Sequence, residues 1–247
     1  MAKIQQKKKV NPSPTLGFMR TIKRLIGKII LGFLGISIVS VLFFKWVPIP
    51  FTWTMLGQKM QAQANGKPTE IHYTWISFDE ISKEAALAVV AAEDQKFPTH
   101  GGFDFQSMRQ AFVSNAKGKK IRGASTISQQ VAKNVFLWQG RSYIRKGLEV
   151  YFTLLIEFIW GKERILEVYL NVAETGRMTF GFEEGAQRYF KKSARHLTRL
   201  EAAKLAAILP SPRKWSVTNP GPYTANRFGK ITRNMRALGG TSYVTNL

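Results

Sequence analysis

The stretch Gly123-Ala124-Ser125-Thr126-Ile127-Ser128-Gln129-Gln130-Val131-Ala132-Lys133-Asn134 lies within a polar segment, residues 93–149, around which the chain is organised. A helix is predicted from Thr126 to Leu137, because apolar residues recur along one side at helical spacing. The other side carries Thr126, Gln129, Gln130 and Lys133. This face would suit hydroxyls, amides and an anion. An ordinary solvent-exposed face is the alternative.

Upstream of this stretch, an Ala-rich helix is predicted from Ser82 to Glu93, followed by a Gly-rich loop. Glu93 would stand at the end of an apolar helix, partly buried, where a carboxylate can act as a general base. Asp94 could instead hold the loop by hydrogen bonds. For this pair alone, two ordinary surface acids are the simpler interpretation.

Downstream, Arg141, Arg145 and Glu149 repeat every four residues, with Lys146 adjacent. Taken alone, the repeat predicts an ion pair within one helix. The basic loop 117–122 and Lys133 add cations, which favours a phosphate-binding site.

Two carboxylates in one groove are typical of enzymes that act on glycosidic bonds. A hydrolase must protonate a sugar leaving group, whereas a diphosphate leaving group needs cations instead. The excess of Arg and Lys near Glu149 therefore favours transfer of a sugar from a diphosphate.

The composition of the 247-residue chain excludes some classes of protein. It has no cysteine, so disulfides and thiol catalysis are excluded, and its three histidines show no metal-ligand spacing. Its hydrophobic content is 45%, and its formal charge of +22 favours anionic partners.

The N-terminal part predicts a membrane anchor. Eight cations and no acid precede residue 29, and residues 29–44 are apolar, small or hydroxylic. With its flanks, this stretch approaches the ~20 residues that a membrane helix needs. A cleaved signal peptide is the alternative, and the long basic lead and the missing small-residue cleavage pattern argue against it. The basic lead predicts a cytoplasmic N-terminus.

The predicted organisation is mainly α. It comprises a basic cytoplasmic tail (1–24) without structure, a transmembrane helix (25–47), a connector (48–69) and an outer domain (70–247). Residues 71–78 alternate as in a strand. Further helices are predicted at Asp104–Asn115, Ser142–Trp160, Lys162–Ala173, from Thr198 to Pro210 and at Tyr223–Leu238.

Several motifs in order, within residues 70–215, resemble the monofunctional biosynthetic peptidoglycan transglycosylases of glycosyltransferase family 51. They are Glu93-Asp94-x-x-Phe97-x-x-His100-x-Gly102-x-Asp104, the stretch 123–134, Arg145-Lys146-x-x-Glu149, Arg164-Ile165-Leu166-Glu167-x-Tyr169-Leu170-Asn171, Gly185-Ala186-x-x-Tyr189-Phe190 and Leu200-Glu201-Ala202-Ala203 to Leu209-Pro210. Each motif alone would be weak, but together in this order they are specific.

The resemblance implies a two-lobed, lysozyme-like helical domain with a membrane-facing jaw. It also implies inverting polymerisation of lipid II into β-1,4 glycan, with release of undecaprenyl diphosphate. Glu93 would be the base and Glu149 would assist at the diphosphate. The implied substrate-binding residues are Asp94, Phe97, His100, Ser125, Thr126, Gln129, Gln130, Lys133, Asn134, Arg141, Arg145 and Lys146. Tyr169 would be mainly structural.

The resemblance leaves other points open. It implies no certain cofactor, but leaves room for Mg²⁺ or another divalent ion near Glu149. The partners expected are lipid II, the growing lipid-linked glycan, membrane lipids and other cell-wall synthesis and division proteins, and not nucleic acid. The expected location is the bacterial inner membrane, with a single span and a periplasmic catalytic domain. A membrane-anchored lytic enzyme of lysozyme-like fold and a basic binding module are the rival functions.

Overall fold

The computed structural model describes residues 14–116, 125–140, 142–245 and 247. The chain divides into two compact units, with the boundary between Phe43 and Phe44. The first unit contains one helix, α1 (Pro14–Phe44), whose last residue belongs to the second unit. Within it, the 27 residues Phe18–Phe44 are long and apolar enough to cross a membrane. Residues 14–24 were predicted to lack structure, but they are helical. The rest of the predicted tail lies outside the described residues.

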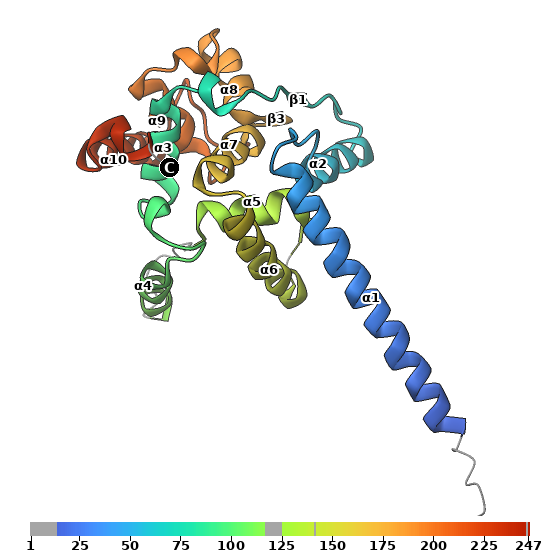
Figure 1. The fold of residues 1–247 in the computed structure, drawn as a ribbon. Coiled ribbons are helices and arrows are strands. Elements are labelled where there is room, and N and C mark those ends of the chain that lie inside the picture. The colour runs from blue at the N-terminus through green and yellow to red at the C-terminus, as the bar shows by residue number, and fades with distance from the viewer. Residues whose placement is uncertain (1–13, 117–124, 141, 246) are drawn as a thin grey trace, which may run out of the picture. The chain divides into compact units, whose positions relative to one another are not determined.

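The second unit, Phe44–Leu247, is mainly helical (Figure 1). Its elements are α2 (Trp53–Ala64), β1 (His72–Tyr73), η1 (Phe78–Glu80), α3 (Lys83–Glu93), η2 (Phe97–Thr99), α4 (Phe105–Ala116), α5 (Ile127–Phe136), α6 (Tyr143–Ile159), α7 (Lys162–Val172), β2 (Glu174–Gly176), β3 (Thr179–Phe180), α8 (Gly181–Phe190), η3 (Ala194–His196), α9 (Arg199–Ile208), α10 (Pro222–Ala237) and η4 (Gly240–Val244).

Part of the core forms around α3, which packs against α9 and α10. Every residue from Ala85 to Ala91 is buried, and four of these seven are alanines. Small side chains on all sides let neighbouring helices approach α3 closely, so the helix can be buried all round. The end of α3, where Glu93 lies, is thereby held on a rigid element.

A second group of helices forms around α5, which packs against α6 and α7. In Figure 1, α4 and α6 extend to the same side of α5, away from α3, α7, α8 and α9. This arrangement gives the helical unit two parts, as predicted for the fold.

A small sheet in the order β1-β3-β2 lies beside α8, with β1 parallel and β2 antiparallel to β3. The strand predicted for residues 71–78 is reduced to His72–Tyr73. β2, β3 and α8 were not predicted from the sequence. Gly181 starts α8 at φ +86°, and a Cβ there would lie 2.6 Å from the Asn171 carbonyl oxygen. Only glycine fits this position.

The predicted connector belongs to the second unit. Its helix α2 contacts α5, and Met55 within it is 1% exposed. Arg164 of α7 donates hydrogen bonds to the carbonyl oxygens of Phe44 (2.9 Å) and Val47 (2.7 Å). The compact unit therefore begins some 25 residues before the domain start predicted from the sequence.

Candidate active site

Asp94, directly after α3, ties the following loop to the start of α5. Its carboxylate is hydrogen-bonded to His100 Nε2 at 2.9 and 3.0 Å, and it accepts a hydrogen bond from the Ile127 amide at 3.0 Å. Phe97 is fully buried beneath this loop, with the Lys162 ammonium 4.7 Å from its ring centre. Phe97 therefore does not make the direct substrate contact predicted for it. The contacts of Asp94 and His100 are with the protein itself.

Thr126 and Gln129 form the N-terminal cap of α5. The Thr126 amide donates to Gln129 Oε1 at 3.0 Å, and Thr126 Oγ1 donates to the Gly102 carbonyl oxygen at 2.6 Å. Both side chains are 2% exposed. The prediction of a substrate-binding face is therefore wrong for these two residues. Their polar atoms are hydrogen-bonded within the capping box and to the loop. Gln130 and Lys133 remain half-buried on this helix, and Ser125 is exposed before it.

Glu93 is held by residues of two other helices. Its Oε2 accepts a hydrogen bond from Gln130 Nε2 at 3.0 Å, and its Oε1 accepts one from Arg227 Nη2 at 2.6 Å. Gln130 Oε1 in turn accepts from the Tyr169 hydroxyl at 3.2 Å. Burial and the neighbouring Glu93 carboxylate raise the pKa of Tyr169 well above its ordinary value, so the phenol keeps its proton.

Arg227 was not anticipated from the sequence. It lies on α10, outside the motifs that carry the resemblance, among other cations of the same helix. Nothing in its spacing distinguishes it from Lys230, Arg233 or Arg236, which are exposed. Only the packing of α10 against α3 brings it to Glu93.

Glu149 is buried among cations. Its Oε1 lies 2.5 Å from Lys146 Nζ, and its Oε2 lies 3.6 Å from Arg145 Nη1. Burial lowers the pKa of Lys133, and the carboxylates of Glu149 and Glu93 act in the opposite direction. Lys133 is thus within electrostatic reach of both carboxylates. Three of the cations predicted to bind phosphate belong to the described residues, and the structure brings them together around Glu149. They are Lys133, Arg145 and Lys146.

Some predicted site residues are not placed against a partner. Arg141 and the basic loop, with Lys117, Lys119, Lys120 and Arg122, lie outside the described residues. Asn134 is half-buried on α5.

The divalent ion considered near Glu149 does not fit this site. Among the described residues, no group of three or more His, Cys, Asp or Glu side chains could hold a metal ion. The groups paired with Glu149 are an ammonium and a guanidinium, which repel a second cation. This part of the site is built for an anion.

Glu93 opens onto a cavity of about 340 Å³. Its wall is formed by Ala91, Ala92, Glu93, Asp94, Gln95, Lys96, Asp104, Ser107, Ser125 and Thr126. Burial would raise the pKa of Asp104, but hydrogen bonds from Ser107 outweigh it and lower that pKa. Lys96, Asp104 and Ser107 are polar wall residues that were not predicted as site residues. A second cavity, of about 500 Å³ beside α2, contains none of the predicted site residues.

The two carboxylates have different surroundings and suit different tasks. Glu93 faces a cavity and accepts a hydrogen bond from an arginine, and a carboxylate in this position can accept a proton from a hydroxyl. Glu149 lies in a cationic cluster that could neutralise an anionic leaving group. A diphosphate leaving group does not have to be protonated, so such a reaction needs no general acid.

The comparisons with known proteins agree over most of the chain. Residues 58–236 match the family model described as Transglycosylase. A protein of Pseudomonas putida KT2440 named "Biosynthetic peptidoglycan transglycosylase" is 50% identical over 229 residues, which cover 93% of this chain and 97% of that protein. Proteins of the same name from Chromohalobacter salexigens and Pseudomonas aeruginosa PAO1 are 50% and 47% identical. Those alignments cover 88% and 93% of this chain, and 93% and 99% of the two relatives.

Proposed function

We propose that this chain, which belongs to the transglycosylase family, polymerises lipid II into β-1,4-linked glycan strands and releases undecaprenyl diphosphate. The chain is a glycosyltransferase of peptidoglycan synthesis, in line with its relatives' name. The observation that carries the proposal is the separation of roles between Glu93 at a cavity wall and Glu149 in a cationic cluster.

In the proposed reaction, a Glu93 oxygen removes the proton from the 4-hydroxyl of the acceptor sugar. The oxygen so freed attacks the anomeric carbon of the donor from the side opposite the diphosphate. The bond from that carbon to the diphosphate oxygen then breaks, which inverts the configuration. The negative charge that develops on the diphosphate is neutralised by Lys133, Arg145 and Lys146, grouped around Glu149.

We further infer that α1 anchors the protein in the bacterial inner membrane, with its N-terminus in the cytoplasm and the second unit outside. One N-terminal helix of sufficient length and apolarity supports this. Cations at its N-terminal end support the orientation, because cytoplasmic flanks carry an excess of Lys and Arg. In this position the site would meet a substrate whose lipid stays in the bilayer.

The substitution Glu93→Gln tests the assignment of the base. The amide keeps the shape of the side chain and leaves an oxygen to accept the Arg227 hydrogen bond, so the fold should persist. Loss of a general base typically lowers a rate by ~10²–10⁴-fold, and we expect a loss of this size in lipid II polymerisation. Activity within threefold of wild type would remove Glu93 from this role.

The same assay separates the rival functions. Wild-type protein should consume lipid II and leave finished, lipid-free glycan strands intact. Cleavage of finished strands, without use of lipid II, would identify a lytic enzyme. Binding without turnover of either substrate would identify a binding module.

A further inference from the structure

We propose that Arg227 is a positioning residue for Glu93, and that Gln130 and Tyr169 hold the other side of the same carboxylate. The inference rests on the proposed function, in which Glu93 is the base. It concerns how the carboxylate is presented to the acceptor hydroxyl.

The two oxygens of Glu93 are held from different elements. Arg227 of α10 donates to Oε1 at 2.6 Å, and Gln130 of α5 donates to Oε2 at 3.0 Å. Because the bonds come from two helices packed on different neighbours, they restrict rotation of the carboxylate. A base whose lone pairs are fixed in direction needs less reorganisation in the transition state.

Tyr169 determines which way the Gln130 amide points. The tyrosine hydroxyl donates to Gln130 Oε1 at 3.2 Å, so the NH₂ group of the same amide must face Glu93. Tyr169 is 2% exposed on α7 and retains its proton. Tyr169 thus has a task beyond filling the core.

The burial of Arg227 is not explained by a contribution to the stability of the fold. Its Nε is buried and has no hydrogen-bond partner, and in the described part of the chain only Arg145 Nε shares this condition. Burying an unpaired donor opposes folding. These two arginines are the ones paired with the two carboxylates of the site. Both are therefore better explained by what they do to Glu93 and Glu149.

The charges that face Glu93 come from several elements. Arg227 contacts it from α10, and Lys133 acts on it from α5 without a hydrogen bond. Tyr169 faces it from α7 as a neutral phenol. Asp94 follows it in the chain, but directs its carboxylate to His100 and to the Ile127 amide. Removing Arg227 takes away the cation in direct contact with Glu93.

The test uses the full-length protein and measures kcat and KM for lipid II polymerisation. In Arg227→Met we expect kcat to fall at least tenfold near neutral pH, with little change in KM. Arg227→Lys keeps the cation but only as a point charge, so it should recover part of the lost kcat and stay below wild type.

Two further variants complete the experiment. Tyr169→Phe should lower kcat by a smaller factor with little change in KM, because it frees the Gln130 amide while the Arg227 contact stays in place. Arg233→Met is the matched control, an exposed arginine on the same helix, and should behave as wild type.

The outcomes distinguish this inference from the proposed function. If Arg227→Met keeps wild-type kcat, with or without a raised KM, Arg227 does not position the base. If Arg227→Met fails to fold, a wild-type kcat in Arg227→Lys overturns the inference. If wild-type protein does not use lipid II at all, the proposed function fails, and the role of Arg227 in it fails as well.

Discussion

Lys133, which we propose binds the donor diphosphate, also lowers the stability of the fold through its burial. Its ammonium is half-buried on α5, and burial lowers its pKa from the ordinary value of 10.5. As the pH falls from that ordinary value through the lowered one, the unfolded chain binds the proton first. Stability is therefore lost over this window as the pH decreases. Below it, the buried charge remains a constant penalty on folding.

We therefore expect Lys133→Met to reduce polymerisation strongly while leaving the fold as stable or more stable. An apolar side chain of similar length removes the cost of burying the charge, which is the largest influence on the pKa of Lys133. The measurements are donor turnover and the free energy of unfolding at pH 10.5 and at successively lower pH. Lys59→Met, at an exposed position of α2, is the control. Parallel loss of stability and activity would make Lys133 a structural residue.

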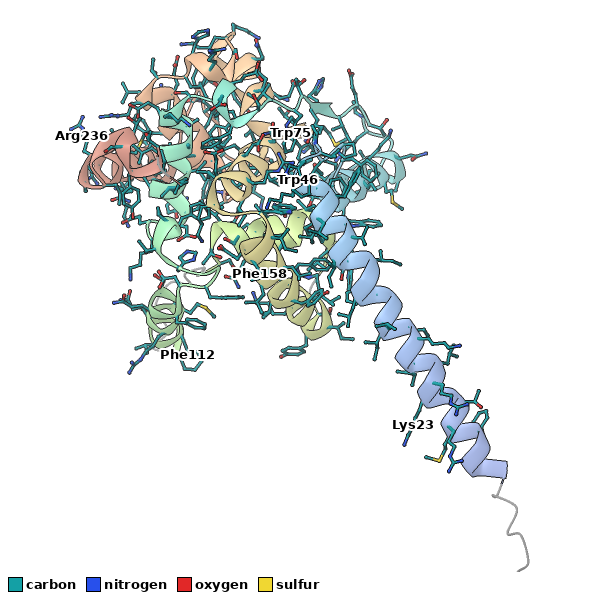
Figure 2. The ribbon with its side chains drawn as sticks, viewed as in Figure 1. Lys23, Trp46, Trp75, Phe112, Phe158 and Arg236 are labelled. Carbon is teal, nitrogen blue, oxygen red and sulfur yellow. The ribbon has the colours of Figure 1, made fainter. Side chains whose placement is uncertain are left out.

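At the scale of elements, α4 and α6 expose an unusual amount of apolar surface. These side chains are Phe105, Met108, Phe112 and Val113 of α4, and Tyr143, Ile144, Val150, Leu154 and Phe158 of α6. Figure 2 labels Phe112 and Phe158, which are 76% and 91% exposed. Both helices extend to the same side of α5 (Figure 1). An apolar surface of this kind marks a membrane or protein contact.

Some apolar side chains near this surface are not available for a membrane contact. Leu137 is 1% exposed, and the Phe136 ring stacks on Phe152 with centres 4.7 Å apart. Both therefore belong to packing between α5 and α6. Phe105, Phe112 and Trp138 are exposed, together with the apolar residues of α6 named above.

We expect Phe112→Ser and Phe158→Ser to slow polymerisation on liposomes several-fold, and more when combined. The physical reason is the loss of apolar area that enters the bilayer, at about 25 cal/mol per Å². In detergent, where a bilayer is absent, rates should stay near wild type. Leu200→Ser, at an exposed apolar position of α9, is the control. Equal slowing in detergent would show that these residues support the site rather than the membrane contact.

At the scale of the whole molecule, the boundary between the two units decides where the protein can be shortened. A start near residue 65 would remove Ile49 and Met55, each 1% exposed. It would also remove the carbonyl partners of Arg164 and the hydrogen bond from Gln58 to Glu174. Loss of one such buried side chain alone typically lowers stability by about 2–5 kcal/mol.

A protein that starts at Phe44 should therefore fold and polymerise lipid II in detergent at a rate near that of the full chain. On liposomes it should be much slower, because α1 no longer holds it where the lipid-linked substrate lies. A protein that starts at residue 65 should melt at a clearly lower temperature, measured by circular dichroism. Equal rates of the Phe44 version and the full chain on liposomes would show that α1 is not needed to bring the protein to its lipid-linked substrate.

The sequence by itself determined the local elements and the family. Caps and periodicity are properties of neighbouring residues, so Ser82, Thr126, Ser142 and Thr198 marked helix starts that the structure confirms. Glu93 at the end of α3, and Glu149 with its Arg145 and Lys146 pairs, followed from spacing alone. The sheet was missed because its strands are two or three residues long, too short for a period to show.

Tertiary structure decided which polar groups are taken and which stay available. Thr126 and Gln129 were predicted to form part of a binding face. Their polar atoms are instead hydrogen-bonded in the cap of α5 and to a loop 24 residues away. Arg227 is one of several cations on its helix in the sequence, but in the fold it donates a hydrogen bond to a carboxylate 134 residues earlier in the chain. Hydrogen bonding and ion pairing across such separations depend on how α3, α5 and α10 pack. The free-energy cost of leaving a polar group unpaired depends on its burial, and burial depends on this helix packing, which cannot be predicted from neighbouring residues alone.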